Sequence, residues 1–168
     1  YNRGTSVYLA DRVIPMLPVE LSNGICSLNA GEDRLSMCAE MEIDANGSVI
    51  KYDIFPTVIH VYRRLTYKLV NRILVEKDTQ MIEDNQDILP LLHNLEVVYK
   101  VLNKRRQMRG AIDFDIPEVK VKLNAKGQAV GLVKREHGLG ESIIEECMLV
   151  ANETVAEHFF WLQTPFVY

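Results

Sequence analysis

The sequence predicts an α+β fold in which antiparallel hairpins pack against long helices. Two turn sequences, Asn46-Gly47 and Ala125-Lys126-Gly127-Gln128, each lie between segments that resemble strands. Two longer segments repeat apolar residues at helical spacing. The resulting order of loop, hairpin, helices, hairpin and helix favours antiparallel pairing over a doubly wound parallel sheet.

Residues 1–31 are expected to form an irregular but packed loop. Pro15 and Pro18 fix φ and remove backbone donors, and glycines punctuate the segment. Its many apolar residues indicate that it buries part of its surface.

The first hairpin is predicted to pair Leu35–Asp44 with Ser48–His60. Asn46-Gly47 supplies the positive φ values that a type I′ turn needs. A short helix is predicted from Thr66 to Val75, with Thr66 as its N-cap.

The clearest helix is predicted over Asp87–Arg109. Asp87 is expected to cap it, Pro90 falls in the first turn, and Gly110 ends it. Its apolar stripe consists of Ile88, Leu91, Leu92, Leu95, Val98 and Leu102.

A second hairpin is predicted to pair Val119–Asn124 with Ala129–Arg135, and the last helix is predicted over Glu141–Leu162. The apolar face of that helix is expected to consist of Ile144, Cys147, Met148, Ala151, Val155, Phe159 and Leu162.

Composition is that of a soluble globular domain, with 48% apolar and 25% charged residues over 168 positions. No apolar run is long enough to cross a membrane, so no membrane association is expected. Three cysteines without C-x-x-C spacing favour a reducing, cytoplasmic setting. A net charge of −4 argues against a nucleic-acid binder that uses its whole surface, but it allows a local basic channel.

Residue patterns alone predict no self-contained active site. The sequence has no H-E-x-x-H, Walker loop, G-x-S-x-G or paired metal-binding cysteines. Asp113 and Asp115 could ligate a metal, but two carboxylates at this spacing are common in loops. The residue patterns by themselves therefore indicate an α+β domain and no particular function.

Five sequence blocks carry a more specific signal. They are R-G-T-S-V-Y-L (3–9), I-P-M-L-P (14–18), L-S-N-G-I-C-S-L (21–28), R-G-A-I-D-F (109–114) and I-E-E-C-M-L-V-A-N (144–152). In this order they resemble the RNB catalytic domain of the ribonuclease R and ribonuclease II family, and bacterial ribonuclease R most of all. The resemblance implies that residues 1–168 are the central portion of one RNB catalytic domain.

The resemblance also implies an activity. Members of the family remove nucleotides processively from the 3′ end of single-stranded RNA, release nucleoside monophosphates and use Mg²⁺. The family's metal-binding aspartates precede the R-G-T-S-V-Y block, and an arginine-rich block and the cold-shock and S1 domains flank this region. Because Tyr1-Asn2-Arg3-Gly4 reads as a chain entered partway through, we expect these parts to lie outside it. The chain alone should then hold no metal and degrade no RNA.

Four positions match family residues along the RNA path. Tyr8 and Phe114 match aromatic residues that stack on the terminal bases; the alternative is that both are core aromatics. Tyr67 and Glu145 match a pair associated with preference for RNA over DNA, through the 2′-hydroxyl. Glu145 could equally be a solvated residue of an acidic helix.

Arg109 is expected to contact phosphate, whereas Lys104, Arg105 and Arg106 fit a solvated helix end better. Asn152 is expected to be buried and hydrogen-bonded. Glu141 and Ser142 depart from the basic residues that many relatives carry there, which puts a phosphate contact at this place in doubt.

Two functions remain open at this stage. One is an exoribonuclease portion that lines the RNA path. The other is a non-catalytic RNA-binding or scaffold module. The aromatic segment from Phe159 to Tyr168 is expected to expose apolar surface and to promote self-association.

Overall fold

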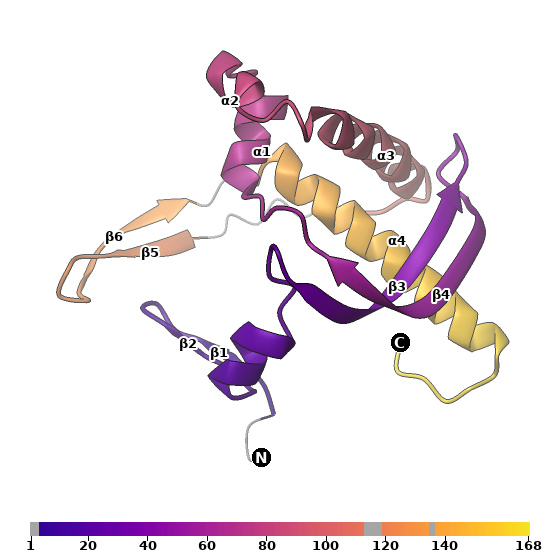
Figure 1. The fold of residues 1–168 in the computed structure, drawn as a ribbon, viewed down its shortest axis with the longest axis horizontal. Coiled ribbons are helices and arrows are strands. Elements are labelled where there is room, and N and C mark those ends of the chain that lie inside the picture. The colour runs from indigo at the N-terminus through magenta and orange to yellow at the C-terminus, as the bar shows by residue number, and fades with distance from the viewer. Residues whose placement is uncertain (1–3, 113–118, 135–136) are drawn as a thin grey trace. The chain divides into compact units, whose positions relative to one another are not determined.

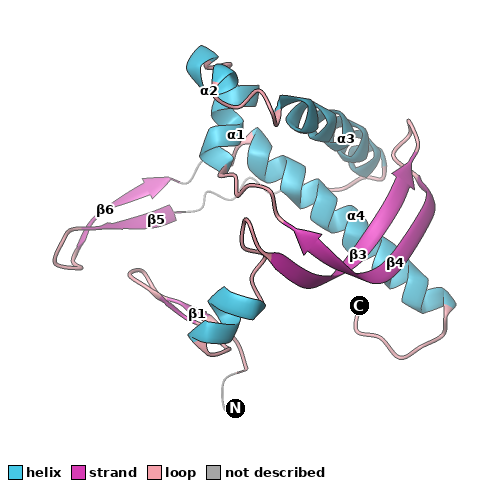
Figure 2. Cartoon of the chain, in the orientation of Figure 1, coloured by secondary structure: helices cyan, strands magenta, loops and turns pink. Residues whose placement is uncertain are grey.

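The computed structural model describes residues 4–112, 119–134 and 137–168 (Figure 1). Contacts within the chain divide it into two compact units, which are considered separately. Unit 1 consists of Tyr1–Ser36, Val58–Arg64 and Phe114–Glu136, and unit 2 consists of Met37–Thr57, Leu65–Asp113 and His137–Tyr168. Figure 2 shows the mixture of helices and two-stranded antiparallel ribbons, so the predicted α+β class is confirmed.

Unit 1 begins with a very short hairpin. Strand β1 (Val7–Tyr8) pairs antiparallel with β2 (Val13–Ile14), and a helical turn, η1 (Leu21–Ile25), follows. The expectation of a packed segment is wrong within the described residues. Its apolar side chains are largely exposed, including those of Val13, Leu21, Ile25 and Leu28.

The first predicted hairpin is confirmed as β3 (Asp33–Ile43) and β4 (Val49–His60). The predicted turn type is wrong. Gly47 has a φ of +82°, but Asn46 is not among the residues with positive φ, so the turn cannot be type I′. The amide of Gly47 donates to Asp44 O and that of Asp44 to Ser48 O, which is a type I turn closed by a left-handed glycine.

The second hairpin uses the same turn. Strands β5 (Val119–Leu123) and β6 (Ala129–Lys134) pair antiparallel, as predicted. Gly127 has a φ of +75°, and its amide donates to Asn124 O. In both turns the first residue, Asp44 or Asn124, accepts two backbone amides through its side-chain oxygen. These bonds favour the observed turn because they satisfy amides that the ladder leaves unpaired.

Unit 2 is built on four helices: α1 (Tyr67–Leu74), α2 (Thr79–Glu83), α3 (Leu89–Met108) and α4 (Leu139–Trp161). Thr66 caps α1 as predicted, because its Oγ1 accepts the amide of Leu69 at 3.3 Å. Helix α2, which Asp78 caps, was not predicted from the sequence. A helix this short shows no periodicity that a pattern search could detect.

Helix α3 has nearly the predicted bounds, but its cap differs. The N-cap residue is Ile88, not Asp87, with Pro90 in the first turn, and Gly110 follows the helix at a φ of +83°. The core of unit 2 consists of Val70, Ile73, Leu74, Ile88, Leu92 and Ile143, which α1, α3 and α4 contribute. Leu91 belonged to the predicted stripe but is 55% exposed.

The predicted apolar face of α4 is only partly buried. Cys147, Ala151, Val155 and Phe159 are half-buried, whereas Ile144, Met148 and Leu162 are exposed. The buried positions are Gly140, Ile143, Glu146, Val150 and Thr154. Thr154 donates to Val150 O within the helix and contacts Met41 Sδ at 3.3 Å on β3. The buried face thus includes two polar residues, Glu146 and Thr154, which an apolar count along the sequence cannot register.

Candidate RNA-facing site

Tyr8, the first residue predicted to contact RNA, lies on β1 in unit 1. It pairs across the short hairpin with Val13, and it is 78% exposed in the described structure. The hairpin is held locally, since Ser6 Oγ accepts the amide of Met16 at 3.0 Å. The exposed ring is therefore available for stacking, and the stacking role itself stays a prediction. Phe114, its predicted partner, lies outside the described residues, as do Asp113 and Asp115.

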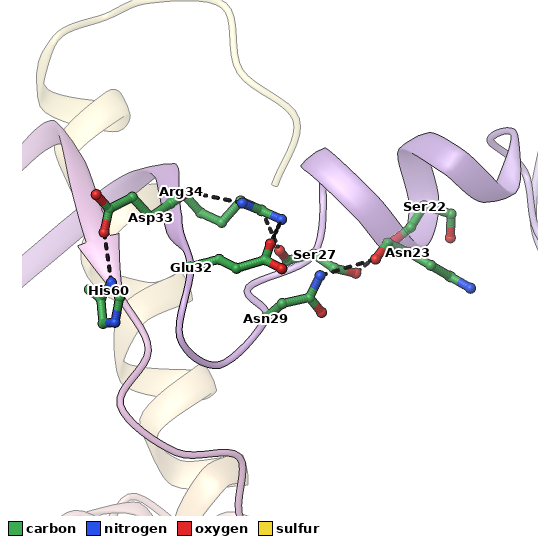
Figure 3. Close-up of polar contacts among 8 residues, drawn as sticks. All are labelled: Ser22, Asn23, Ser27, Asn29, Glu32, Asp33, Arg34 and His60. Carbon is green, nitrogen blue, oxygen red and sulfur yellow. Dashed lines mark hydrogen bonds and ion pairs between the residues drawn. The ribbon is translucent and has the colours of Figure 1, made fainter.

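A polar group in unit 1 holds η1 to the start of β3 (Figure 3). Arg34 donates to Ser27 O at 3.1 Å and pairs with Glu32. At the open end of the hairpin, His60 Nδ1 lies 2.7 Å from Asp33 Oδ1. The His60–Asp33 pair is exposed and ties the ends of β3 and β4 together.

Tyr67 and Glu145 belong to unit 2, on α1 and α4. Tyr67 is the first residue of α1 and is partly exposed. Glu145 is about half exposed, and its Oε2 lies 3.5 Å from His137 Nε2. Both side chains can meet solvent, and their role in reading the 2′-hydroxyl stays a prediction.

A hydrogen-bonded clamp joins the two helices that carry this pair. Asn71 Nδ2 donates to Glu141 Oε2 at 3.1 Å, and Asn71 Oδ1 accepts the amide of Gly140 at 2.8 Å. Glu141 Oε2 also accepts the amide of Gly138 at 3.2 Å, which caps the start of α4. Tyr67 lies one turn before Asn71, and Glu145 lies one turn after Glu141. The clamp thus fixes the two helices one turn away from both predicted RNA contacts.

The clamp accounts for two features of the sequence. At Gly138, any Cβ would fall 2.2 Å from Asn71 Nδ2, so a side chain there would displace the clamp. Burial acts to raise the pKa of Glu141, but the hydrogen bonds from Asn71 and the backbone outweigh it and hold that pKa below its ordinary value. Glu141 is therefore a structural residue in this chain.

The basic cluster at the end of α3 is largely paired. Arg109 Nη2 and Nη1 lie 2.8 and 3.2 Å from the two carboxylate oxygens of Glu153 on α4. These bonds raise the pKa of Arg109, so the guanidinium stays charged. A phosphate would have to share Arg109 with Glu153, and the predicted phosphate contact remains untested. Arg105 donates to Gly47 O at 2.9 Å, in the turn of the first hairpin.

Arg106 makes the most buried of these contacts. Its Nε donates to Glu146 Oε1 at 2.7 Å, and Asn103 Nδ2 donates to the same oxygen at 3.1 Å. The side chain of Glu146 is only 5% exposed and that of Arg106 only 18%. Describing Arg105 and Arg106 as a solvated helix end is therefore wrong. Asn152, predicted to be buried, is exposed.

Two further observations bear on function. Among the residues that the structure describes, no three His, Cys, Asp or Glu side chains come together in a way that could hold a metal ion. Within the same residues, no helix is both long and apolar enough to span a bilayer.

Comparison with known proteins decides the family. A model described as the RNB domain matches residues 1–168. The chain belongs to the RNB domain family. Its RNB sequence is 48% identical to Ribonuclease R of Thermotoga maritima over the whole chain and 24% of that protein. It is 45% identical to Ribonuclease R 1 of Lactococcus lactis subsp. lactis over the whole chain and 20% of that protein. The chain thus spans about a quarter or less of the length of these curated relatives.

Solved structures agree with this RNB assignment. The apo form of RNase R from Mycoplasma genitalium is 30% identical, with a TM-score of 0.82 over 95% of this chain and 24% of that one. The same protein has been solved with ribose-methylated single-stranded RNA, also at a TM-score of 0.82 over 95% of this chain. The Dss1 exoribonuclease of Candida glabrata, at 18% identity and a TM-score of 0.77, shares the fold.

Proposed function

We propose that this chain is part of a processive, metal-dependent 3′→5′ exoribonuclease that acts in the cytoplasm. The enzyme would release nucleoside monophosphates from single-stranded RNA, and this portion would line the RNA path. The observation that carries the proposal is the RNB match over residues 1–168, supported by 48% identity to a protein named Ribonuclease R. The structure of the Mycoplasma genitalium RNase R with ribose-methylated single-stranded RNA supports single-stranded RNA as a ligand, and the same protein has also been solved with double-stranded RNA.

The residues proposed to line the path are Tyr8, Phe114, Tyr67, Glu145 and Arg109. Tyr8 would offer an exposed ring to a base, with Phe114 as the proposed opposing ring. Tyr67 and Glu145, on helices that the Asn71–Glu141 clamp joins, would contact the 2′-hydroxyl. Arg109, held by Glu153, would place one positive charge near a phosphate.

The proposed metal is Mg²⁺, which prefers oxygen ligands. The described residues do not fit such a site, because they bring no suitable cluster of carboxylates together. We therefore derive no step through the metal, and propose that its ligands lie outside the residues described. The same observation leaves a non-catalytic RNA-binding or scaffold module as the second candidate.

The test compares the complete protein with the 168-residue chain. Both are incubated with end-labelled single-stranded RNA and Mg²⁺, with and without a chelator. We expect the complete protein to release monophosphates one at a time in a metal-dependent manner, and the 168-residue chain to release none. An inactive complete protein that still binds RNA would favour the scaffold candidate. Activity of the chain alone would contradict the proposed position of the metal ligands.

A further inference from the structure

The β5–β6 hairpin is strongly basic in a chain that is acidic as a whole. The segment Val119–Lys134 contains four lysines and neither Asp nor Glu, whereas the full chain has a net charge of −4. The lysines are Lys120, Lys122, Lys126 and Lys134, and all four are exposed. Within the described residues, none of them forms an ion pair with a carboxylate. The hairpin therefore presents a local positive charge that no described carboxylate neutralises.

The strand register sorts these lysines by face. Lys120 pairs with Val133 and Lys122 with Gly131, so Lys120 and Lys122 project from the same face of the hairpin. Val121 pairs with Leu132 on the opposite, apolar face. Two residues apart on one strand, the two ammonium groups are anchored about 6–7 Å from each other. We call the surface formed by Lys120, Lys122, Gly131 and Val133 the lysine face.

Gly131 places no side chain on the lysine face beside Lys122. The strand register shifts between Lys122 and Leu123, so Gly131 lies next to a β-bulge or similar irregularity. Its φ is not positive, and a Cβ built there would meet no atom within 4 Å. Glycine inside a strand often marks a bulge or a place where another molecule comes close to the backbone, and the register shift here agrees with the first reading. The open space at Gly131 leaves the backbone and the two neighbouring lysines accessible to a polyanion that approaches along the strands.

We infer that the lysine face binds the sugar–phosphate backbone of RNA, outside the set of residues listed above for the RNA path. The inference rests on the proposed function and adds a contact surface to it. Segment Val119–Lys134 contains no aromatic residue to stack on a base, and lysine binds phosphate as a point charge. The contact should therefore be independent of RNA sequence, which suits an enzyme along which RNA must slide.

The test measures how RNA affinity depends on salt. Equilibrium binding of labelled oligouridylate to the complete protein is followed over a range of KCl concentrations, with chelator present to prevent hydrolysis. Each phosphate contact to single-stranded RNA contributes about −0.7 to the slope of log Kobs against log salt. Lys120→Gln with Lys122→Gln should make the slope shallower by about 1.4, and oligocytidylate should give the same change.

A matched control uses two lysines that already have carboxylate partners. Lys51 lies 3.4 Å from Glu42, Lys100 lies 2.6 Å from Glu96, and both are well exposed. Lys51→Gln with Lys100→Gln removes the same charge and should leave the slope nearly unchanged. Equal slopes for the hairpin variant and the unaltered protein would overturn the inference, as would equal changes in the hairpin and control variants.

Gly131 provides a second, independent arm. Because the space around it is open, Gly131→Glu and Gly131→Gln introduce side chains of the same size and differ in charge. The Glu variant should bind RNA about 5- to 10-fold more weakly than the Gln variant, as expected for one unfavourable charge of roughly 1 kcal/mol. Identical affinities would count against the inference. If the unaltered protein binds no RNA, the proposed function itself fails, and that outcome is distinct from a failure of the lysine face.

Discussion

Removing Arg106 should strongly destabilise unit 2, because it would leave a buried carboxylate without its cation. Glu146 is 5% exposed at its side chain, and its Oε1 accepts from Arg106 Nε at 2.7 Å and from Asn103 Nδ2 at 3.1 Å. Arg106→Met keeps most of the apolar stem of the side chain. Of the two donors just named, only Asn103 would then remain to bind Glu146 Oε1. Breaking a buried pair from one side costs about 3–5 kcal/mol.

The opposite truncation should cost less. Glu146→Leu removes the buried anion and leaves Arg106, whose side chain is 18% exposed and can reach water. We expect a loss of about 1–3 kcal/mol from that change. Arg106→Met combined with Glu146→Leu replaces both charges by apolar groups of similar volume. The double variant should therefore be more stable than Arg106→Met alone, by about 2 kcal/mol.

The assay is urea unfolding of all three variants and the unaltered protein, with free energies from linear extrapolation. Lys100→Met on the same helix is the control, because the Lys100 side chain is 63% exposed and its i, i+4 pair with Glu96 is worth about 0.5 kcal/mol or less. An Arg106→Met loss no larger than that of Lys100→Met would show that the buried pair does not stabilise unit 2. A double variant that loses the full sum of the two single losses would show that the two charges do not act as a pair.

Four further predictions concern other residues. Asn71→Asp should lower stability by about 1–3 kcal/mol at neutral pH by setting a second carboxylate against Glu141, and adding Glu141→Gln should restore part of it. The pKa of Glu141 is lowered in the folded state, so the stabilisation that its carboxylate gives is present above about pH 4.5 and is lost as the pH falls through the folded-state pKa. The free energies of urea unfolding of the unaltered protein and of Glu141→Gln should therefore converge in acid. Gly47→Ala should lower the free energy of unfolding more than Gly127→Ala does in the same assay. Both changes replace a left-handed glycine, at about 1–2 kcal/mol. A Cβ at Gly47 also lies 3.1 Å from Val101 O, whereas a Cβ at Gly127 meets no atom within 4 Å. Tyr8→Ala in the complete protein should lengthen the final RNA products while reducing initial rates on long RNA less, since stacking is worth about 1–3 kcal/mol; a fall in melting temperature with unchanged products would remove Tyr8 from the site.

The hairpins show how far local sequence determines structure here. The turn residues located both hairpins correctly. The type I′ turn predicted for the first hairpin was wrong. Asn46-Gly47 is typical of a type I′ turn, but Asp44 Oδ1 accepts the amides of Asn46 and Ser48 at 2.9 and 2.8 Å. Asn124 does the same in the second hairpin. The residue that decides the turn therefore precedes the Asn-Gly pair, and an Asp or Asn placed three residues before the glycine was the signal to use.

Helix positions were also predictable, whereas buried faces were not. Leu139–Trp161 differs from its predicted span by only one or two residues at each end, because length and periodicity mark a helix wherever it packs. Its buried face includes Glu146 and Thr154. Arg106 and Asn103 on α3 donate to Glu146, and Met41 Sδ on β3 lies 3.3 Å from Thr154 Oγ1. Such partners come from elsewhere in the fold, so a single segment does not reveal them.

Hydrogen bonds within unit 2 also change which positive charges are candidates for binding RNA. The sequence draws attention to the cluster at the end of α3, yet Arg105, Arg106 and Arg109 there each bind a carbonyl or carboxylate within unit 2. A guanidinium that already neutralises a carboxylate releases few counterions when a phosphate arrives, and so contributes little to salt-dependent affinity. Lys120 and Lys122 are less conspicuous in the sequence but have no carboxylate partner within the described residues. The salt dependence of RNA binding should therefore follow the hairpin lysines more closely than the denser arginine cluster.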